Sequence, residues 1–332
     1  MLTREYLIQN KEAALDKAIG SLCGLAIGDS FGDAARSPEN QRDYGITTDF
    51  NKGSSWSTDD TEFALLTAET IIEAGGDFTS EDVVTMWLRH VATEDELKRG
   101  GVSEVEACNN LRRGMRPPES GRFNAYYLSD GAAMRSGPIG ILCAGDPERA
   151  ARLAEIDASV SHHMDGVWGA QAVAVAVSLA MVDASMDEIL DSVLKTAPKG
   201  SWFRETLLRA FQIVDDANGD IADAWMPLHY ELFSTHRSTV AEALPEVFGC
   251  LKLEHGSFKS GLILAGNFGR DADTIGAVAG AVLGAKYGAK GIPEKWLQKT
   301  RYPSGTCLGF TKGIDIFDRA ARLAALINRS WA

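Results

Sequence analysis

The sequence predicts an all-α fold. Apolar residues recur at helical spacing along most of the 332 residues, whereas the alternation typical of β-strands is almost absent. An apolar content of 45% with 24% charged residues is that of an ordinary folded protein able to bury a sizeable core. No shift in composition marks a boundary, so we expect a single domain over residues 1–332.

The first helix is predicted over residues 4–27 and is expected to end at Gly28-Asp29. Glycines at positions 24, 28 and 32 would let another backbone approach this segment closely. Residues 33–57 have no helical period and are predicted to form a long loop, and loops of this length are often functional.

Helical periodicity continues through the rest of the chain. A helix over 59–74 stops at Gly75-Gly76, Ser80 is expected to cap a helix over 81–91, and a short helix is expected over 103–113. The remaining predicted helices are 132–143, 147–157, 165–184, 187–196, 202–217, 220–233, 239–254, 257–266, 272–288, 293–299 and 313–329.

Two acidic clusters open predicted helices far apart in the sequence. One is Ser57-Thr58-Asp59-Asp60-Thr61, and the other is Asp271-Ala272-Asp273-Thr274. Hard divalent cations such as Mg²⁺ and Mn²⁺ prefer oxygen ligands, and a pair of ions about 4 Å apart needs carboxylates from different segments. The two clusters together are therefore a candidate binuclear centre.

Ordinary helix capping is the alternative explanation for both clusters. Ser, Thr and Asp are preferred at helix N-termini, where they accept hydrogen bonds from free N–H groups and interact favourably with the helix dipole. Ser57 with Asp60 resembles a capping box, and Asp271 with Thr274 could form a simple cap. Doubled acids at two helix starts exceed what capping requires, which favours the metal-site interpretation.

The clusters resemble the two metal-binding signatures of the ADP-ribosylglycohydrolase family, which includes the dinitrogenase reductase-activating glycohydrolase. Three further blocks match in order. They are the glycine-spaced segment 20–32, the Gly131-Ala132-Ala133-Met134-Arg135 loop, and Ser161-His162. The resemblance covers most of the chain and implies an orthogonal multi-helix bundle.

The resemblance also implies a hydrolase that cleaves the glycosidic bond at C1″ of an ADP-ribosyl group, using water activated by two Mg²⁺ or Mn²⁺ ions. The implied metal ligands are Thr58, Asp59, Asp60, Asp271, Asp273 and Thr274, with Asp59 and Asp60 also counted as catalytic. Unlike most glycosidases, such an enzyme would not rest on two opposed carboxylates alone.

One departure from the family concerns the general acid/base. The family's glutamate is expected eight residues after Gly28, where this chain has Arg36. Asp33 and Glu39 lie three residues to either side, and either is a candidate replacement. Arg36 could instead bind a phosphate or carboxylate of the substrate, or be a solvated surface residue.

Several further residues are candidate substrate contacts. Asp29 could orient a metal-bound water or simply be a turn residue, and Arg135 could contact a phosphate or form a structural ion pair. Asp130 replaces the family's asparagine. The full candidate set is Asp29, Arg36, Asp130, Gly131, Ala132, Met134, Arg135 and His162.

Composition limits the class of partner. A net charge of −13 argues against a nucleic-acid backbone, and no apolar run reaches the length needed to cross a bilayer. Five widely spaced cysteines and a charged N-terminal segment favour a cytoplasmic protein with reduced thiols. The oligomeric state stays open.

The partner is accordingly an ADP-ribosylated protein or a small ribosyl compound. Two alternatives remain: a glycohydrolase acting on a small nucleoside, and a non-catalytic ADP-ribose-binding or structural protein. Loss of the metal carboxylates would favour the non-catalytic alternative, but all four are present.

Overall fold

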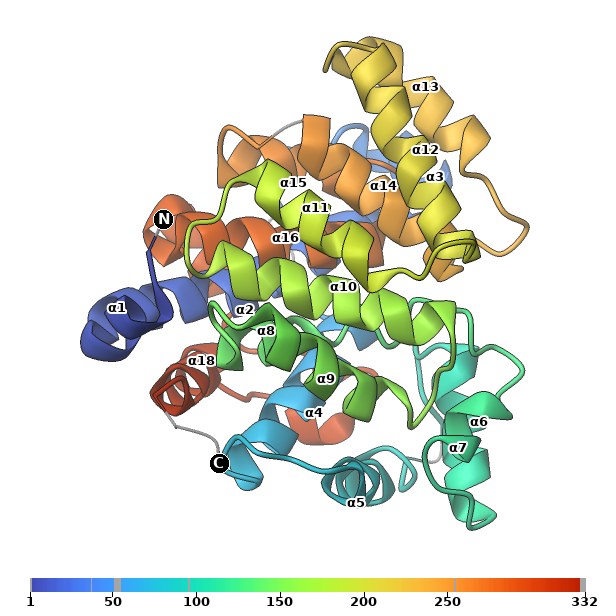
Figure 1. Ribbon diagram of the computed structural model, residues 1–332, viewed down its shortest axis with the longest axis vertical. Coiled ribbons are helices and arrows are strands. Elements are labelled where there is room, and N and C mark those ends of the chain that lie inside the picture. The colour runs from blue at the N-terminus through green and yellow to red at the C-terminus, as the bar shows by residue number, and fades with distance from the viewer. Residues whose placement is uncertain (1, 37, 51–54, 95, 254, 329–332) are drawn as a thin grey trace.

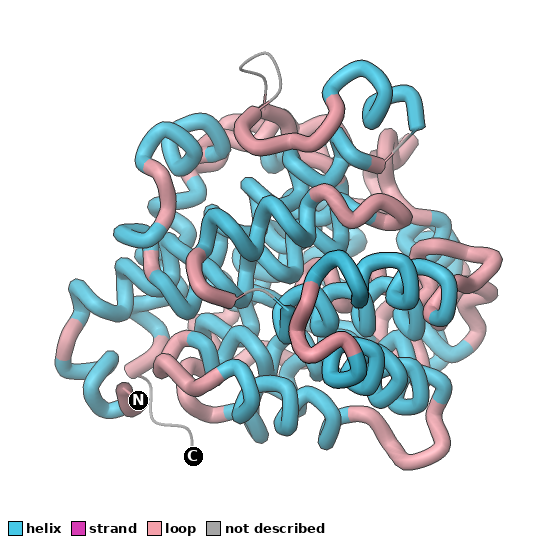
Figure 2. The backbone as a smooth tube through the Cα atoms, turned by 90° about the horizontal axis from the view of Figure 1, so that it is seen from above, coloured by secondary structure: helices cyan, strands magenta, loops and turns pink. Residues whose placement is uncertain are grey.

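Eighteen α-helices make up most of the chain that the computed structural model describes, which is residues 2–36, 38–50, 55–94, 96–253 and 255–328. No β-strand occurs within these ranges (Figure 2). Ser129 and Thr239 form an isolated bridge. The prediction of an all-α fold is confirmed. The α-helices are α1 (Arg4–Gln9), α2 (Lys11–Ala35), α3 (Pro38–Tyr44), α4 (Asp59–Glu73), α5 (Ser80–His90), α6 (Val102–Arg112), α7 (Glu119–Arg122), α8 (Gly137–Leu142), α9 (Pro147–Ala158), α10 (Asp165–Ala180), α11 (Met186–Thr196), α12 (Trp202–Asp216), α13 (Ile221–Glu231), α14 (Val240–Leu253), α15 (Phe258–Gly266), α16 (Ala272–Tyr287), α17 (Glu294–Thr300) and α18 (Ile316–Leu326).

The centre of the fold is the antiparallel pair α2 and α16, which cross the interior behind α10 in Figure 1. The two backbones touch, because glycines of α2 face glycines of α16. A Cβ atom added at Gly24 would lie 2.2 Å from the Gly280 carbonyl oxygen, and one at Gly28 would lie 1.9 Å from that of Gly276. The predicted close approach at these glycines is confirmed, and α16 is the partner.

This helix pair sets the position of the acidic residues. The C-terminal half of α2, which carries Asp29 and Asp33, runs beside the N-terminus of α16, which carries Asp271 and Asp273. A Cβ at Gly32 would lie 1.8 Å from the Ala272 carbonyl oxygen, so the close contact continues to the first residue of α16. Two segments 240 positions apart in sequence are thereby held at backbone contact.

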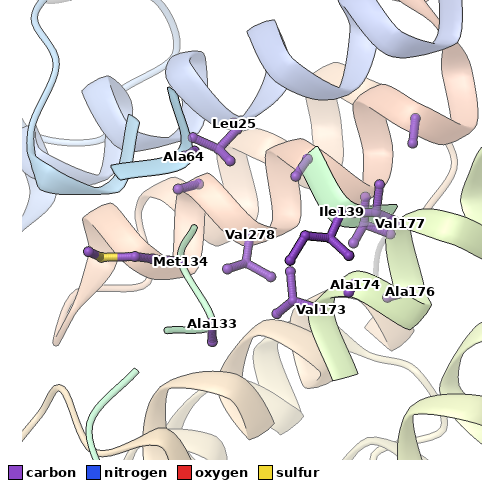
Figure 3. Packing of buried hydrophobic residues seen from close by; sticks show 14 of the residues in the cluster. Leu25, Ala64, Ala133, Met134, Ile139, Val173, Ala174, Ala176, Val177 and Val278 are labelled. Carbon is purple, nitrogen blue, oxygen red and sulfur yellow. The ribbon is translucent and has the colours of Figure 1, made fainter. Parts of the chain in front are cut away.

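The remaining helices pack around this pair and bury an extensive apolar core. Figure 3 shows side chains of α2, α4, α8, α10 and α16 meeting there, among them Leu25, Ala64, Ile139, Val173 and Val278. All five cysteines are buried and free. Within the described ranges no helix combines the length and the apolar character that crossing a membrane requires.

Several predicted boundaries are wrong. The first helical segment is interrupted at Asn10, and α2 does not end at Gly28-Asp29 but continues to Ala35. Gly28 is not a helix stop but a packing position, and the apolar residues after it stay buried on the same helix. The predicted 33–57 loop contains the end of α2 and also α3, and its residues 51–54 lie outside the described part.

Two helix starts also differ from the prediction. Thr79, not Ser80, caps α5, because Thr79 and Asp82 exchange both hydrogen bonds of a capping box. The helix expected over 132–143 begins only at Gly137, and the residues before it form turns. The glycine-containing loop at 131 is therefore not at a helix N-terminus.

Candidate metal centre and active-site cavity

The two acidic clusters meet in space. Asp59 and Asp60 begin α4, and Asp273 lies in the first turn of α16. One oxygen from each of these three buried carboxylates lies within 4.8 Å of the other two. The sequence prediction that the clusters converge is borne out for these three residues.

These acids do not act as helix caps. Thr58 and Asp271 occupy the N-cap positions of α4 and α16, and neither side chain makes a capping hydrogen bond. The predicted capping box of Ser57 with Asp60 is wrong, because the Ser57 Oγ donates to Glu62 Oε1 at 2.6 Å. Capping therefore does not explain the doubled acids.

Asp29 of α2 takes over the capping of α4. Its Oδ2 accepts a hydrogen bond from the Thr58 N–H at 2.9 Å, and its Oδ1 accepts one from the Thr58 hydroxyl at 2.7 Å. The Thr61 hydroxyl also donates to Oδ2. Asp29 lies in the middle of a helix rather than at its end, and its contacts fix the first turn of α4 and so orient Asp59 and Asp60.

Burial and mutual repulsion oppose ionisation of the cluster. Burial raises the pKa of Asp59 and of Asp60 well above the usual range, and the nearby charge of Asp273 raises both further. The pKa of Asp273 is raised to about 7 by burial and then by the charge of Asp271, with Arg36 acting in the opposite direction. A bound cation would relieve this repulsion.

Unpartnered oxygens show that one divalent cation fits this donor set. The Asp60 Oδ1 and Asp273 Oδ1 atoms are buried and have no hydrogen-bond partner. Buried carboxylate oxygens are normally paired, and an all-oxygen set of this kind suits Mg²⁺ or Mn²⁺. Asp59, Asp60 and Asp273 would hold the ion.

Arg36 occupies the other side of the predicted binuclear centre. As the residue after the last turn of α2, it ion-pairs with Asp273 and, from Nη2, with Asp271 Oδ1 at 3.0 Å. Arg237 lies 3.4 Å from the same Asp271 oxygen. Burial acts to lower the pKa of Arg36, but the charges of Asp273 and Asp271 outweigh burial and raise it.

The cluster opens into a cavity of about 210 Å³. Of the predicted metal ligands, Asp59, Asp60, Asp271, Asp273 and Thr274 line it, and Thr58 does not. The other lining residues are Arg36, Arg99, Gly100, Gly101, Val102, Ser103, Glu104, Tyr126, Ser129, Asp130, Gly131, Met134, His236 and Ser238. The cavity therefore joins the metal cluster to the predicted substrate loop.

The predicted substrate residues fall into two groups. Arg36, Asp130, Gly131 and Met134 line the cavity, whereas Asp29, Ala132, Arg135 and His162 do not. Arg135 is completely buried, pairs with Asp157 at 2.7 Å and donates to the Gly131 carbonyl at 2.9 Å. It forms the structural ion pair that was one of its two predicted roles.

The two predicted acid/base candidates lie elsewhere. Glu39 is exposed on α3 and does not line the cavity. Asp33 is buried on α2, where it accepts a hydrogen bond from the Trp56 indole and pairs with Arg99. Neither carboxylate is placed in the wall of the cavity.

Glu104, which no sequence pattern indicated, is a carboxyl group in the cavity wall. It lies in the first turn of α6, is completely buried, and its Oε1 has no hydrogen-bond partner. A Cβ added at Gly131 would lie 2.1 Å from Oε1, so this glycine leaves room for the carboxyl group. Burial raises the pKa of Glu104, although the charge of Arg135 acts against this.

A directed chain of hydrogen bonds ends at Glu104. Ser103 Oγ donates to Glu104 Oε2 at 2.8 Å, and Ser129 Oγ donates to Ser103 Oγ at 2.9 Å. Because Ser129 has given its proton to Ser103, His162 Nε2 must be the donor in its 2.8 Å bond to Ser129. Burial and then the charge of Arg135 lower the pKa of His162, which keeps the ring neutral.

Neutral His162 thus carries its proton on Nε2, and Nδ1 accepts from the Ser161 hydroxyl at 2.7 Å. His162 does not line the cavity, but it is hydrogen-bonded to Ser129, which does. Glutamate in the first turn of a helix looks like an ordinary surface acid. The one available signal was the preceding Gly100-Gly101 pair, since a Cβ added at Gly101 would lie 2.2 Å from Glu104 Oε2.

Known proteins resemble this chain over nearly its whole length. Residues 10–331 match the ADP-ribosylglycohydrolase family. An uncharacterised protein of Archaeoglobus fulgidus is 33% identical over 85% of this chain and 91% of its own length. ADP-ribosylarginine hydrolase Tri1 of Pseudomonas putida is 26% identical over 95% of this chain and 81% of its own.

The fold is also known from a solved structure. The "ADP-ribosylglycohydrolase-related protein complex" superposes with a TM-score of 0.65 at 21% identity, covering 95% of this chain and 98% of that one. With an all-helical domain and a buried acidic cluster at two helix N-termini, this chain belongs to the ADP-ribosylglycohydrolase family. The family resemblance predicted from the sequence is confirmed.

Proposed function

We propose that this protein is a metal-dependent glycohydrolase that cleaves the C1″ glycosidic bond of an ADP-ribosyl group. The observation that carries the proposal is the buried Asp59–Asp60–Asp273 cluster, which has unpartnered oxygens and opens into the cavity beside Gly131. The Pseudomonas relative is named as an ADP-ribosylarginine hydrolase, which is an activity of this class.

A cation bound at this site would act as a Lewis acid. A divalent cation held by Asp59, Asp60 and Asp273 would polarise a ribose hydroxyl or a water molecule in the cavity. Thr58, Asp271 and Thr274 lie beside these carboxylates and complete the predicted ligand set. Asp29, by holding the first turn of α4, keeps Asp59 and Asp60 in position.

Glu104 is the group best placed to hold a proton near the reacting bond. Its unpartnered Oε1 lies in the wall of the cavity, and burial favours the protonated form. The hydroxyl of Ser103 donates a hydrogen bond to Oε2, so Oε1 is the carboxyl oxygen that remains without a partner. A protonated carboxyl group of this kind can donate to the leaving nitrogen or oxygen and then accept a proton from water.

Arginines near the cavity are suited to the diphosphate of ADP-ribose. The chain as a whole carries a net charge of −13. Arg99 pairs with Asp33 and Arg237 contacts Asp271, but their side chains are 43% and 44% exposed, so each still has a face open to a phosphate, and Arg99 lines the cavity. Pockets that enclose a whole drug-sized ligand measure about 300 Å³ or more. The cavity here measures about 210 Å³, which suits the reacting ribose, and the rest of the substrate would lie outside it.

A small nucleoside is the second candidate substrate, because Arg36 is already engaged by Asp271 and Asp273 and is not free to meet a phosphate. The two candidates are separated by incubating the Mn²⁺-loaded protein with ADP-ribosylarginine and with purine and pyrimidine nucleosides. Release of ADP-ribose alone supports the first proposal. Release of ribose alone supports the second, and binding of ADP-ribose without turnover of any compound indicates a non-catalytic protein.

A further inference from the structure

Arg36 is placed where the second ion of a binuclear centre would need ligands. Its guanidinium contacts Asp273 through one terminal nitrogen and Asp271 through the other. The side chain is 23% exposed, and its Nε atom is buried without a partner. The positive charge therefore lies inside the acidic cluster rather than out in the solvent.

The contacts of Arg36 leave the two possible ion positions unequal. The Asp59–Asp60–Asp273 position keeps unpartnered oxygens on Asp60 and Asp273, so an ion can bind there while Arg36 stays in place. A position that used Asp271 would compete with Arg36 and Arg237, which both contact its Oδ1. A guanidinium does not lose its proton in proteins, so the competition cannot be relieved by deprotonation.

The positive charges already present point the same way. Arg36 contacts Asp271 and Asp273, and Arg237 contacts Asp271. A second divalent ion that used Asp271 would bind directly beside these two guanidinium groups, and like charges at short range repel strongly.

We propose that this protein binds one divalent cation at Asp59, Asp60 and Asp273, and that the guanidinium of Arg36 replaces the second ion expected of a binuclear centre. The proposal rests on the metal site of the proposed function, but not on its substrate. Arg36 is a positioning residue here, since it holds Asp271 and Asp273 in place of a metal.

Metal stoichiometry tests this inference without any assay of activity. Mn²⁺ binding is measured by equilibrium dialysis, and the electron paramagnetic resonance spectrum distinguishes isolated ions from a spin-coupled pair. We expect one Mn²⁺ per wild-type chain with the spectrum of an isolated ion. Arg36→Gln removes the charge and should admit a second Mn²⁺ with a spin-coupled spectrum, whereas Arg36→Lys, which keeps the charge, should still bind one.

Arg99→Gln is the matched control, because Arg99 lines the same cavity but pairs with Asp33 instead of a predicted ligand. It should keep the wild-type stoichiometry, and melting curves check that each variant is folded. A coupled pair of ions in the wild type, or a single ion in a folded Arg36→Gln variant, would overturn the inference. Absence of any bound ion would refute this inference and the metal centre of the proposed function together, whereas a pair in the wild type would refute the inference alone.

Discussion

Replacing Gly28 by alanine tests whether the glycine contact between α2 and α16 positions the metal cluster. The added Cβ would lie 1.9 Å from the Gly276 carbonyl oxygen and 2.3 Å from its carbon. Both partners are backbone atoms in the middle of a buried helix, so no side chain can move aside. The helices would have to separate by about 1.5 Å to reach an ordinary contact distance.

Two effects of Gly28→Ala oppose each other. Alanine favours the helix by about 1 kcal/mol, whereas overpacking of a rigid core costs about 1–3 kcal/mol and more where backbone atoms collide. We expect the overpacking to dominate, with a net loss of about 2 kcal/mol and a melting temperature lower by about 3 °C. Because the shift also moves Asp273 away from Asp59 and Asp60, Mn²⁺ binding should weaken roughly tenfold.

Gly137→Ala is the control, since its Cβ would approach nothing nearer than 3.4 Å. Thermal unfolding by circular dichroism and Mn²⁺ titration by calorimetry give the two readouts. The control should melt within about 1 °C of the wild type and bind Mn²⁺ unchanged. A Gly28→Ala protein that matched this control in both measurements would refute the idea that the glycine contact sets the site.

Three further predictions concern single groups in the site. Asp29→Asn should lower the free energy of unfolding by about 1–3 kcal/mol and weaken Mn²⁺ binding, because the carboxylate that accepts hydrogen bonds from Thr58 is lost. An unchanged melting temperature and an unchanged Mn²⁺ affinity would contradict this. Glu104→Gln should lower kcat by about a hundredfold or more while leaving Mn²⁺ affinity unchanged, and an unaltered kcat would exclude Glu104 as the proton donor. In metal-free protein, burial and then the charge of Asp271 raise the pKa of Asp273 to about 7, above its unfolded value of about 4. The folded state therefore binds more protons than the unfolded state in this range. The free energy of unfolding should accordingly fall as the pH rises from about 4 to about 7. Urea unfolding with a chelator should show this fall and Asp273→Asn should reduce it, and a free energy that rose over the same range would contradict it.

The helical class and the metal cluster were predictable because they depend on local patterns. Apolar spacing identifies most of the helices, and glycines repeated every fourth position indicate a close helix contact. Two acidic residues stand at each of two helix N-termini, which is more than capping requires. The structure brings Asp59, Asp60 and Asp273 together. What the sequence could not give was the partner of each helix, which is a property of the fold.

The errors arose where a tertiary contact overrides a local signal. Gly28 followed by Asp29 looks like a helix stop, but the glycine packs against Gly276 and the aspartate caps a different helix. Glu104 looks like a surface acid of a first turn, yet it is completely buried in the cavity wall. Arg36 had no local pattern, and its position among the carboxylates follows only from the path of α2.

The most direct test of the central claim is hydrolysis of ADP-ribosylarginine by the wild type and by Asp273→Asn, each with Mn²⁺ and with a chelator. We predict release of ADP-ribose that requires the metal and is lost in Asp273→Asn, which lacks one carboxylate of the cluster and is checked for folding by circular dichroism. Turnover that persists in the chelator, or that survives Asp273→Asn, would contradict the assignment of this cluster as the active centre.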